Sequence, residues 1–250
     1  MTATCGVAAE RVIKSERGTR IWSEPLSGGG RAVVKMYRHR GIADPLRRWF
    51  VPYRAEREYR LLQRLSARGL PCPEPLSWSH GSDRGNGRFE TLSTREIEGV
   101  LPLSDRLRAG TAPDLAPLFA LARRMHEAGV AHGAFYPANI LVADNPGDAG
   151  TFYLIDLAHG CRFSRDLGGR RPAEFDLLDL LRGVARIVPL AAPARWLAAY
   201  GVDGATSRRL LGRFERHRLE RPWRHFRRME TDTREALDCW LHPGARDPGA

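Results

Sequence analysis

Lysine, paired cysteines and long apolar runs are all scarce in this 250-residue sequence. The four cysteines lie far apart, with no CxxC pattern and no histidine at a zinc-ligand spacing, which argues against a disulfide framework or a structural zinc site. No run of 18 apolar residues occurs, and the first ten residues have neither the positive start nor the apolar stretch of a secretory signal. We therefore expect a cytoplasmic protein.

The composition is otherwise that of a folded globular protein. Apolar residues make up 42% and charged residues 28%, which leaves no support for a disordered, collagen-like or coiled-coil chain. The net charge is +11, and only two of the 40 basic residues are lysines, Lys14 and Lys35. The charge indicates an anionic partner, and a lysine kept in an arginine-rich chain points to a need for a compact, flexible point charge.

The N-terminal part has the pattern of a small sheet with one helix. Residues 31–37 are rich in β-branched and aromatic side chains and follow a glycine turn, which predicts a strand that carries Lys35. Residues 52–67 have helical periodicity, with Glu58 on the same stripe as three leucines. Because a carboxylate on an apolar stripe needs a cationic partner, we expect Glu58 to pair with Lys35.

Helical patterns dominate the rest of the chain. Residues 76–80 and 89–97 alternate like strands, and Glu98 and Gly99 end the sheet. These patterns predict two lobes, residues 1–98 with the sheet and residues 99–250 with most of the helices.

A predicted hairpin carries the candidate metal ligands. Residues 139–143 and 151–156 are strand-like, and the seven residues between them are rich in Asp, Asn, Pro and Gly. Counting outward from the turn puts Asn139 and Asp156 nearly opposite each other. An amide and a carboxylate that leave room for water and phosphate oxygens are ligands suited to Mg²⁺.

The order of these residues is that of the kinase fold: a strand lysine, a helix glutamate, then Asn and Asp. The segments VVKMYRHRG, AEREYRLLQRLSARGLPCPEP, MHEAGVAHGAFYPANILV and FYLIDL resemble the lipopolysaccharide core kinases, the Kdo and heptose kinase group, between about residues 17 and 186. The resemblance implies an α+β, protein-kinase-like fold, with a small antiparallel-sheet N-lobe with one helix and a mainly helical C-lobe. It also implies that ATP and Mg²⁺ are used to phosphorylate a sugar hydroxyl of a cell-envelope glycan.

The same resemblance assigns roles to particular residues. Lys35 is expected to bind the nucleotide phosphates and act in catalysis, with Glu58 orienting it. Asn139 and Asp156 are expected to hold the metal, Asp156 being catalytic. Residues 96–99 are expected to form the hinge beside adenine, with Glu96 and Glu98 among the nucleotide-binding residues, and Gly18 to be the remnant of the glycine loop.

One position departs from the family pattern. The catalytic loop of the family reads HxD with Asn five residues after the aspartate, and here the aspartate position is Ala134. Loss of a general base costs about 10² to 10⁴ in rate. We considered Asp144, Asp148 and His159 as replacements, but nothing in the sequence places them. A pseudokinase that binds nucleotide or a protein partner is therefore a second interpretation, and an aminoglycoside-type phosphotransferase is a third.

A strongly basic segment lies near the C-terminus. Residues 207–228 hold nine arginines and two glutamates. Two interpretations account for this charge equally well. One is a solvated helix face, and the other is contact with anionic glycolipid headgroups at the inner face of the membrane. We expect no nucleic-acid binding, because aromatic residues are sparse there and no nucleic-acid-binding motif occurs.

Overall fold

The computed structural model describes residues 10–16, 18–39, 53–83, 87–143, 151–184 and 192–217. The chain divides into two compact units. The first comprises the described residues of Met1–Gln63 and Pro73–Glu98, and the second those of Arg64–Cys72 and Gly99–Ala250.

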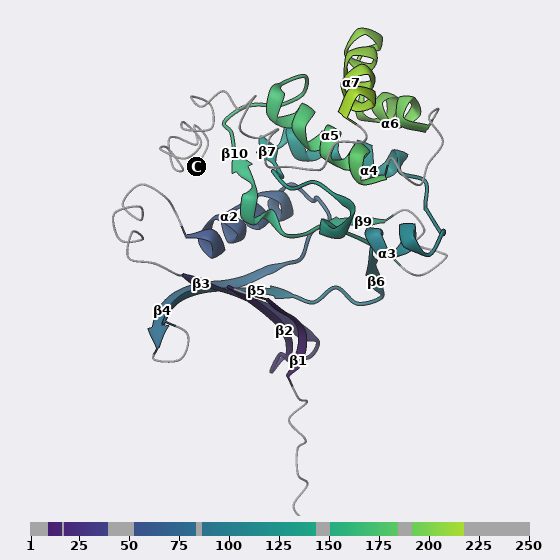
Figure 1. Cartoon of the computed structure of the whole chain (residues 1–250). Coiled ribbons are helices and arrows are strands. Elements are labelled where there is room, and N and C mark those ends of the chain that lie inside the picture. Colours follow the sequence, from purple (N-terminus) through teal and green to yellow (C-terminus); the bar gives the residue numbers. More distant parts are fainter. Residues whose placement is uncertain are drawn as a thin grey trace, which may run out of the picture. The chain divides into compact units, whose positions relative to one another are not determined.

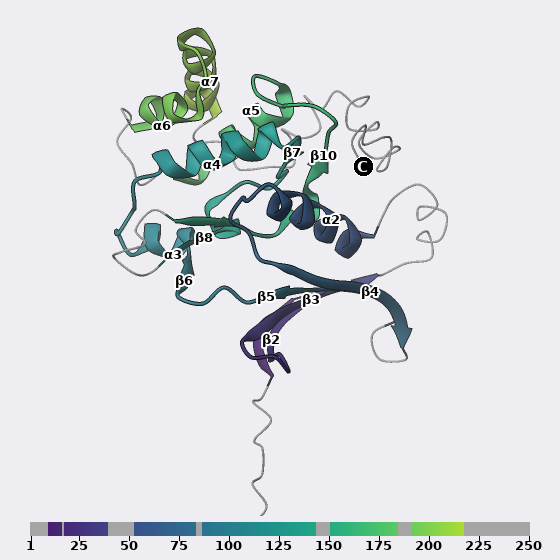
Figure 2. The same ribbon diagram turned by 180° about the vertical axis from the view of Figure 1, so that it is seen from behind.

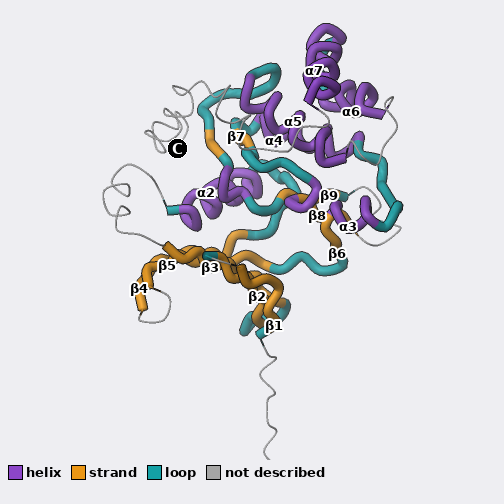
Figure 3. Tube along the Cα trace, in the orientation of Figure 1, coloured by secondary structure: helices purple, strands orange, loops and turns teal. Residues whose placement is uncertain are grey.

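A five-stranded antiparallel sheet forms most of the first unit (Figures 1 and 3). Its strands are β1 (Arg11–Glu16), β2 (Thr19–Pro25), β3 (Arg31–His39), β4 (Pro75–Asp83) and β5 (Gly87–Arg95). The spatial order is β1-β2-β3-β5-β4, so β3 is the central strand. Lys35 lies on β3 between Ile21 of β2 and Leu92 of β5. The strand predicted at residues 31–37 is confirmed and extends two residues further.

Helix α2 (Arg54–Ala67) confirms the helix predicted at residues 52–67. Its leucines Leu61, Leu62 and Leu65 are buried, as is Glu58. The helix ends in a turn where the Leu70 N–H donates to the Leu65 carbonyl at 3.0 Å. Gly69 adopts φ +63° in this turn, a conformation that glycine reaches without strain.

The second unit is mainly helical (Figure 2). Its described helices are α3 (Leu103–Arg108), α4 (Ala116–Glu127), α5 (Arg171–Val184), α6 (Ala192–Tyr200) and α7 (Gly204–His217), with short 3₁₀ turns η1 (Pro137–Asn139) and η3 (Leu157–His159). Two small sheets complete it, one of β6 (Val100–Pro102), β8 (Ile140–Ala143) and β9 (Phe152–Leu154), the other of β7 (Val130–Ala131) and β10 (Cys161–Arg162).

Aromatic packing and one cluster of charges join the helices of this unit. Phe119 of α4 stacks on Trp196 of α6 with ring centroids 5.7 Å apart. Glu174 of α5, 7% exposed at its side chain, accepts hydrogen bonds from Arg209 and Arg213 of α7. These two arginines of the basic segment therefore bind the protein itself, and residues 218–228 lie outside the described part.

The hairpin predicted around residues 139–156 is confirmed as β8 paired antiparallel with β9. Asn139 differs from the prediction because it ends the 3₁₀ turn η1 and precedes the strand. The Ile155 N–H nevertheless donates to the Asn139 carbonyl at 3.2 Å, so the pairing continues one step past the strands. Residues 144–150, the predicted turn, are not among the described residues.

In the part of the chain that the structure describes, no helix has the length and apolar character needed to span a membrane.

We expect Gly183→Ala to destabilise the protein, although alanine is the better helix former. A Cβ on Gly183 would lie 2.2 Å from Cδ of Pro137, so α5 and η1 would have to separate. Overpacking of this kind costs about 1–3 kcal/mol. Gly212→Ala in α7 is the matched control, since a Cβ there meets nothing within 4 Å. Thermal unfolding should show a lower Tm for the first variant and an unchanged or higher Tm for the second; an unchanged Tm for Gly183→Ala would contradict the tight contact.

Candidate active site

Lys35 and Glu58 form a buried ion pair in the first unit. Nζ of Lys35 lies 2.7 Å from Oε1 of Glu58, and their side chains are 13% and 1% exposed. The predicted pairing is confirmed. Removing either side chain would leave the other charge buried without a partner, which is costly, so each stabilises the other in its buried position.

The second oxygen of Glu58 is also bound. The Tyr37 hydroxyl donates to Oε2 at 2.7 Å. Tyr37 lies two residues after Lys35 on β3 and therefore points to the same face of the sheet. The sequence analysis assigned Tyr37 no role, although the alternation of β3 contained the necessary signal.

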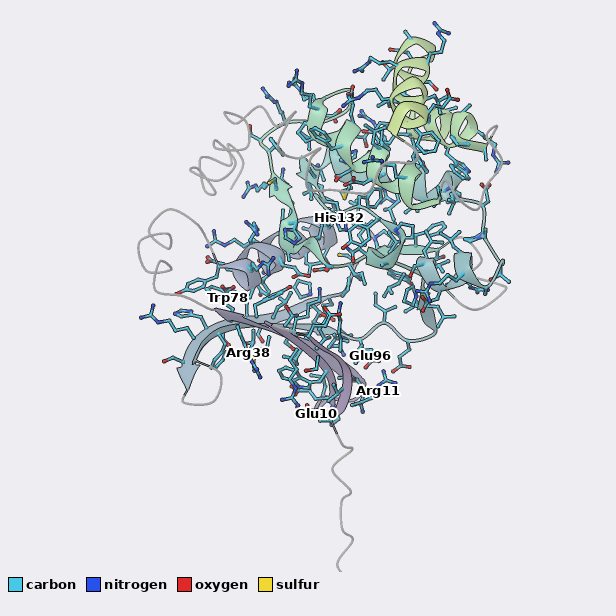
Figure 4. All side chains as sticks on the ribbon, in the orientation of Figure 1. Glu10, Arg11, Arg38, Trp78, Glu96 and His132 are labelled. Carbon is cyan, nitrogen blue, oxygen red and sulfur yellow. The ribbon has the colours of Figure 1, made fainter. Side chains whose placement is uncertain are left out.

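Glu96 follows β5 and has partners within its own unit. Its carboxylate accepts a hydrogen bond from Arg11 at 2.6 Å and one from the Ser23 hydroxyl, and it lies 3.5 Å from Arg31, while its N–H donates to the Arg31 carbonyl (Figure 4). Contact with adenine would therefore have to use its carbonyl. Glu98 is exposed.

Gly18 lies in the turn between β1 and β2, with φ +93°. Its carbonyl accepts a hydrogen bond from the Arg38 N–H at 2.8 Å, which ties this turn to β3. The assignment of Gly18 to a phosphate-covering loop stays a prediction.

In the second unit, the loop from His132 to Asn139 connects β7 to β8. Nδ2 of Asn139 donates to the Ala134 carbonyl at 3.0 Å. This bond closes the loop on itself and leaves Oδ1 of Asn139 as the side-chain atom suited to a cation.

Asp156 lies beside Asn139 at the mouth of the hairpin, one residue past the Ile155 amide that binds the Asn139 carbonyl. It is the one non-glycine residue with positive φ in the described part, at φ 60° and ψ 56°. Such a conformation costs about 1–3 kcal/mol and is often found at functional sites. An amide oxygen and a carboxylate at one edge fit the preference of Mg²⁺ for oxygen ligands.

His132, labelled in Figure 4, is fully buried. Its Nε2 lies 3.0 Å from the Ile155 carbonyl, next to Asp156. Burial lowers the pKa of His132, so the ring is neutral, Nε2–H donates to the carbonyl, and Nδ1 has no hydrogen-bond partner.

A buried carboxylate that the sequence analysis missed holds this loop in place. Asp176 of α5, 1% exposed, accepts hydrogen bonds from the N–H groups of His132 and Gly133 at 2.6 and 2.9 Å. Nε2 of His126 lies 3.1 Å from the same carboxylate, and its Nδ1 lies 2.8 Å from the Tyr200 hydroxyl. Because a carboxylate only accepts, Nε2–H of His126 donates to Asp176. Burial raises the pKa of Tyr200 to about 12, so its hydroxyl stays protonated. A carboxylate on the apolar face of the FDLLDLL helix was the available signal.

Ala134 occupies the position where the family pattern has its aspartate. Its side chain is buried, and its carbonyl is bound by Asn139. Of the replacement bases considered, His159 is exposed at the end of η3, and Asp144 and Asp148 lie outside the described residues.

A family model described as "Lipopolysaccharide kinase (Kdo/WaaP) family" matches residues 8–200. The chain belongs to this family. Similar sequences include the 3-deoxy-D-manno-octulosonic acid kinases of two Xylella fastidiosa strains. The M23 protein is 28% identical over 190 residues, covering 73% of this chain and 72% of that protein. The 9a5c protein is 29% identical over 189 residues, with the same coverage.

Solved structures show the same fold. WaaP in complex with acyl carrier protein superposes with a TM-score of 0.62 at 18% identity, covering 83% of this chain and 87% of WaaP. The amicoumacin kinase hAmiN, in complex with AMP-PNP, Ca²⁺ and Ami, superposes with a TM-score of 0.56 at 12% identity, covering 91% and 88%. The α+β, protein-kinase-like fold class expected from the sequence is confirmed.

The buried state of His132 predicts how stability depends on pH. Because its pKa is lower in the folded than in the unfolded protein, the unfolded state binds more protons below about pH 6.5, and stability falls as the pH falls. We expect His132→Gln, whose Nε2 can still donate to the Ile155 carbonyl, to flatten this loss between pH 7.5 and 5.5 in urea titrations with a chelator present. The exposed His80→Gln variant should keep the wild-type dependence. Equal pH slopes for wild type and His132→Gln would contradict a neutral buried ring.

Proposed function

We propose that this chain is a lipopolysaccharide-type kinase that binds ATP and Mg²⁺ and transfers the γ-phosphoryl group to a sugar hydroxyl of a cell-envelope glycan. The observation that carries the proposal is the pairing of Lys35 with Glu58 in one unit, together with Asn139 and Asp156 at the mouth of the β8–β9 hairpin in the other. These are the parts that phosphoryl transfer uses for positioning and for neutralising charge.

Each residue has a defined part in this proposal. Lys35 binds a phosphate oxygen through its ammonium group, and Glu58 fixes the direction of that group. Asn139 and Asp156 hold Mg²⁺, which neutralises negative charge on the phosphates when it is bound. The acceptor is an anionic glycolipid or its sugar, because the similar sequences are named for kinases of an acidic sugar and this chain carries a net charge of +11.

We place the protein in the cytoplasm, where ATP is available. Contact with the inner face of the membrane through residues 207–228 would have to use basic residues other than Arg209 and Arg213, whose guanidinium groups bind Glu174.

Ala134 favours a second candidate, a pseudokinase that binds nucleotide without transferring phosphate. The loop is built without a carboxylate at this position, while the groups proposed to bind nucleotide and metal are present. The two candidates share a nucleotide site and differ in the rate of transfer, so binding and transfer need separate tests.

We expect MgATP to raise the Tm of the wild-type protein and to have little effect on Lys35→Ala or Asp156→Ala. Ligand at 100 times its Kd stabilises a folded protein by about 2.7 kcal/mol, which a melting curve detects easily. Lys14→Ala is the matched control, since Lys14 is an exposed residue of β1 that pairs with Glu16. Scans with ATP alone test the part played by Mg²⁺. A wild-type Tm that does not respond to MgATP would overturn the proposal and the pseudokinase alternative that binds nucleotide.

We expect Ala134→Asp to raise the rate of transfer from γ-labelled ATP to lipopolysaccharide core by about 10² or more, because it introduces a general base. Ala134→Asn is the control, with a side chain of the same size that accepts no proton. If Ala134→Asp binds MgATP like the wild type yet transfers no phosphate, the site lacks more than a base and the pseudokinase interpretation prevails. If the wild type is already active and the aspartate adds nothing, another group provides the base.

A further inference from the structure

Both oxygens of the Glu58 carboxylate are bound by side chains of β3. Lys35 binds Oε1 and Tyr37 binds Oε2, each at 2.7 Å. A carboxylate bound through one oxygen is free to turn about that contact, whereas one bound through both has its plane fixed. The Tyr37 hydroxyl therefore restricts the same group that restricts the Lys35 amine.

A second carboxylate holds the start of the same helix. Oε2 of Glu90, on β5, accepts a hydrogen bond from the Ala55 N–H at 2.7 Å, and Glu90 is 1% exposed. The first N–H groups of a helix have no partner inside the helix and carry a partial positive charge, so a buried carboxylate there is stabilising. This contact anchors the first turn of α2 to the sheet.

The two contacts act at one level of the sheet. Tyr37 and Glu90 are direct partners in the register of β3 and β5. On the helix they hold Ala55 and Glu58, which are three residues apart and so lie one turn from each other, about 4.5 Å along the axis. Two neighbouring strands thus hold two successive turns, which opposes both sliding and rolling of α2.

We infer that Tyr37 and Glu90 are positioning residues for the phosphate-binding lysine: they fix α2 and the Glu58 carboxylate so that the Lys35 ammonium group is held in one direction. The inference rests on the proposed function for its meaning in catalysis. The effect of these two contacts on Lys35, however, is tested without nucleotide.

Having only two lysines makes a direct test available. Acetic anhydride acetylates unprotonated, accessible amines, and mass spectrometry of peptides reports Lys14 and Lys35 separately. Lys14, 51% exposed at its side chain, is the internal reference in every sample. The measured quantity is the ratio of the Lys35 rate to the Lys14 rate at a fixed pH.

Three variants decide the matter. Tyr37→Phe removes one hydroxyl from a buried ring, and Glu90→Leu removes the acceptor at the start of α2. Tyr59→Phe is the matched control, because it removes a hydroxyl on the same helix that accepts a hydrogen bond from the Gln63 side chain. We expect the ratio to rise about threefold to tenfold in the first two, the factor by which one net hydrogen bond shifts an equilibrium, and to stay at the wild-type value in the third.

The same proteins are then titrated with MgATP. We expect Tyr37→Phe and Glu90→Leu to bind it with a Kd raised by a similar factor, and Tyr59→Phe to bind it like the wild type. A Tyr37→Phe protein that melts cooperatively and keeps the wild-type labelling ratio overturns the inference, and so does a raised ratio with an unchanged Kd. If the wild-type protein binds no MgATP but the labelling ratios are as expected, the proposed function is refuted, while the positioning of Lys35 by Tyr37 and Glu90 is supported.

Discussion

The shape of the candidate catalytic loop depends on one buried negative charge. Asp176 is almost fully removed from water, and a carboxylate in that position is tolerated only if donors surround it. The donors are the amides of His132 and Gly133 and the ring of His126. A hydrogen bond from a backbone amide fixes the path of the chain whatever side chain the residue carries. Through Asp176, α5 therefore sets the path of the loop independently of the side chains of the site.

This dependence explains how Ala134 fits into the loop. The bonds that define it run from the His132 and Gly133 amides to Asp176, from Asn139 to the Ala134 carbonyl, and from the His132 ring to the Ile155 carbonyl. None of them uses a side chain at position 134. A carboxylate at position 134 is therefore not needed to hold the loop or Asn139 in place.

The first unit also depends on a buried carboxylate, Glu58, that is held by donors. Comparing it with Asp176 shows which contacts the sequence can predict and which it cannot. Glu58 was found from its place among leucines, and its pairing with Lys35 followed because both lie on short, regular elements close in sequence. The register of the β8 and β9 hairpin followed from counting for the same reason. Asp176 lies 43 to 50 residues from its partners in the chain, and no local pattern identifies partners at that separation. The pairing of Arg209 and Arg213 with Glu174 was missed likewise, because charge density does not reveal whether an arginine faces solvent or a buried carboxylate.

The relative size of the catalytic contributions decides what the loss of a base means. A general base supplies about 10² to 10⁴ in rate, or about 3 to 5 kcal/mol of the barrier. Holding the reactants in line supplies about 7 to 11 kcal/mol, and in phosphoryl transfer the remaining stabilisation comes from groups that neutralise charge on the phosphates. The residues suited to these larger contributions are the ones whose positions are fixed by buried partners, Lys35 by Glu58 and Asn139 by the loop that Asp176 holds. Under the proposed function, the alanine at position 134 removes a contribution smaller than that of positioning, and we expect it to lower the rate of the transfer step more than the affinity for nucleotide.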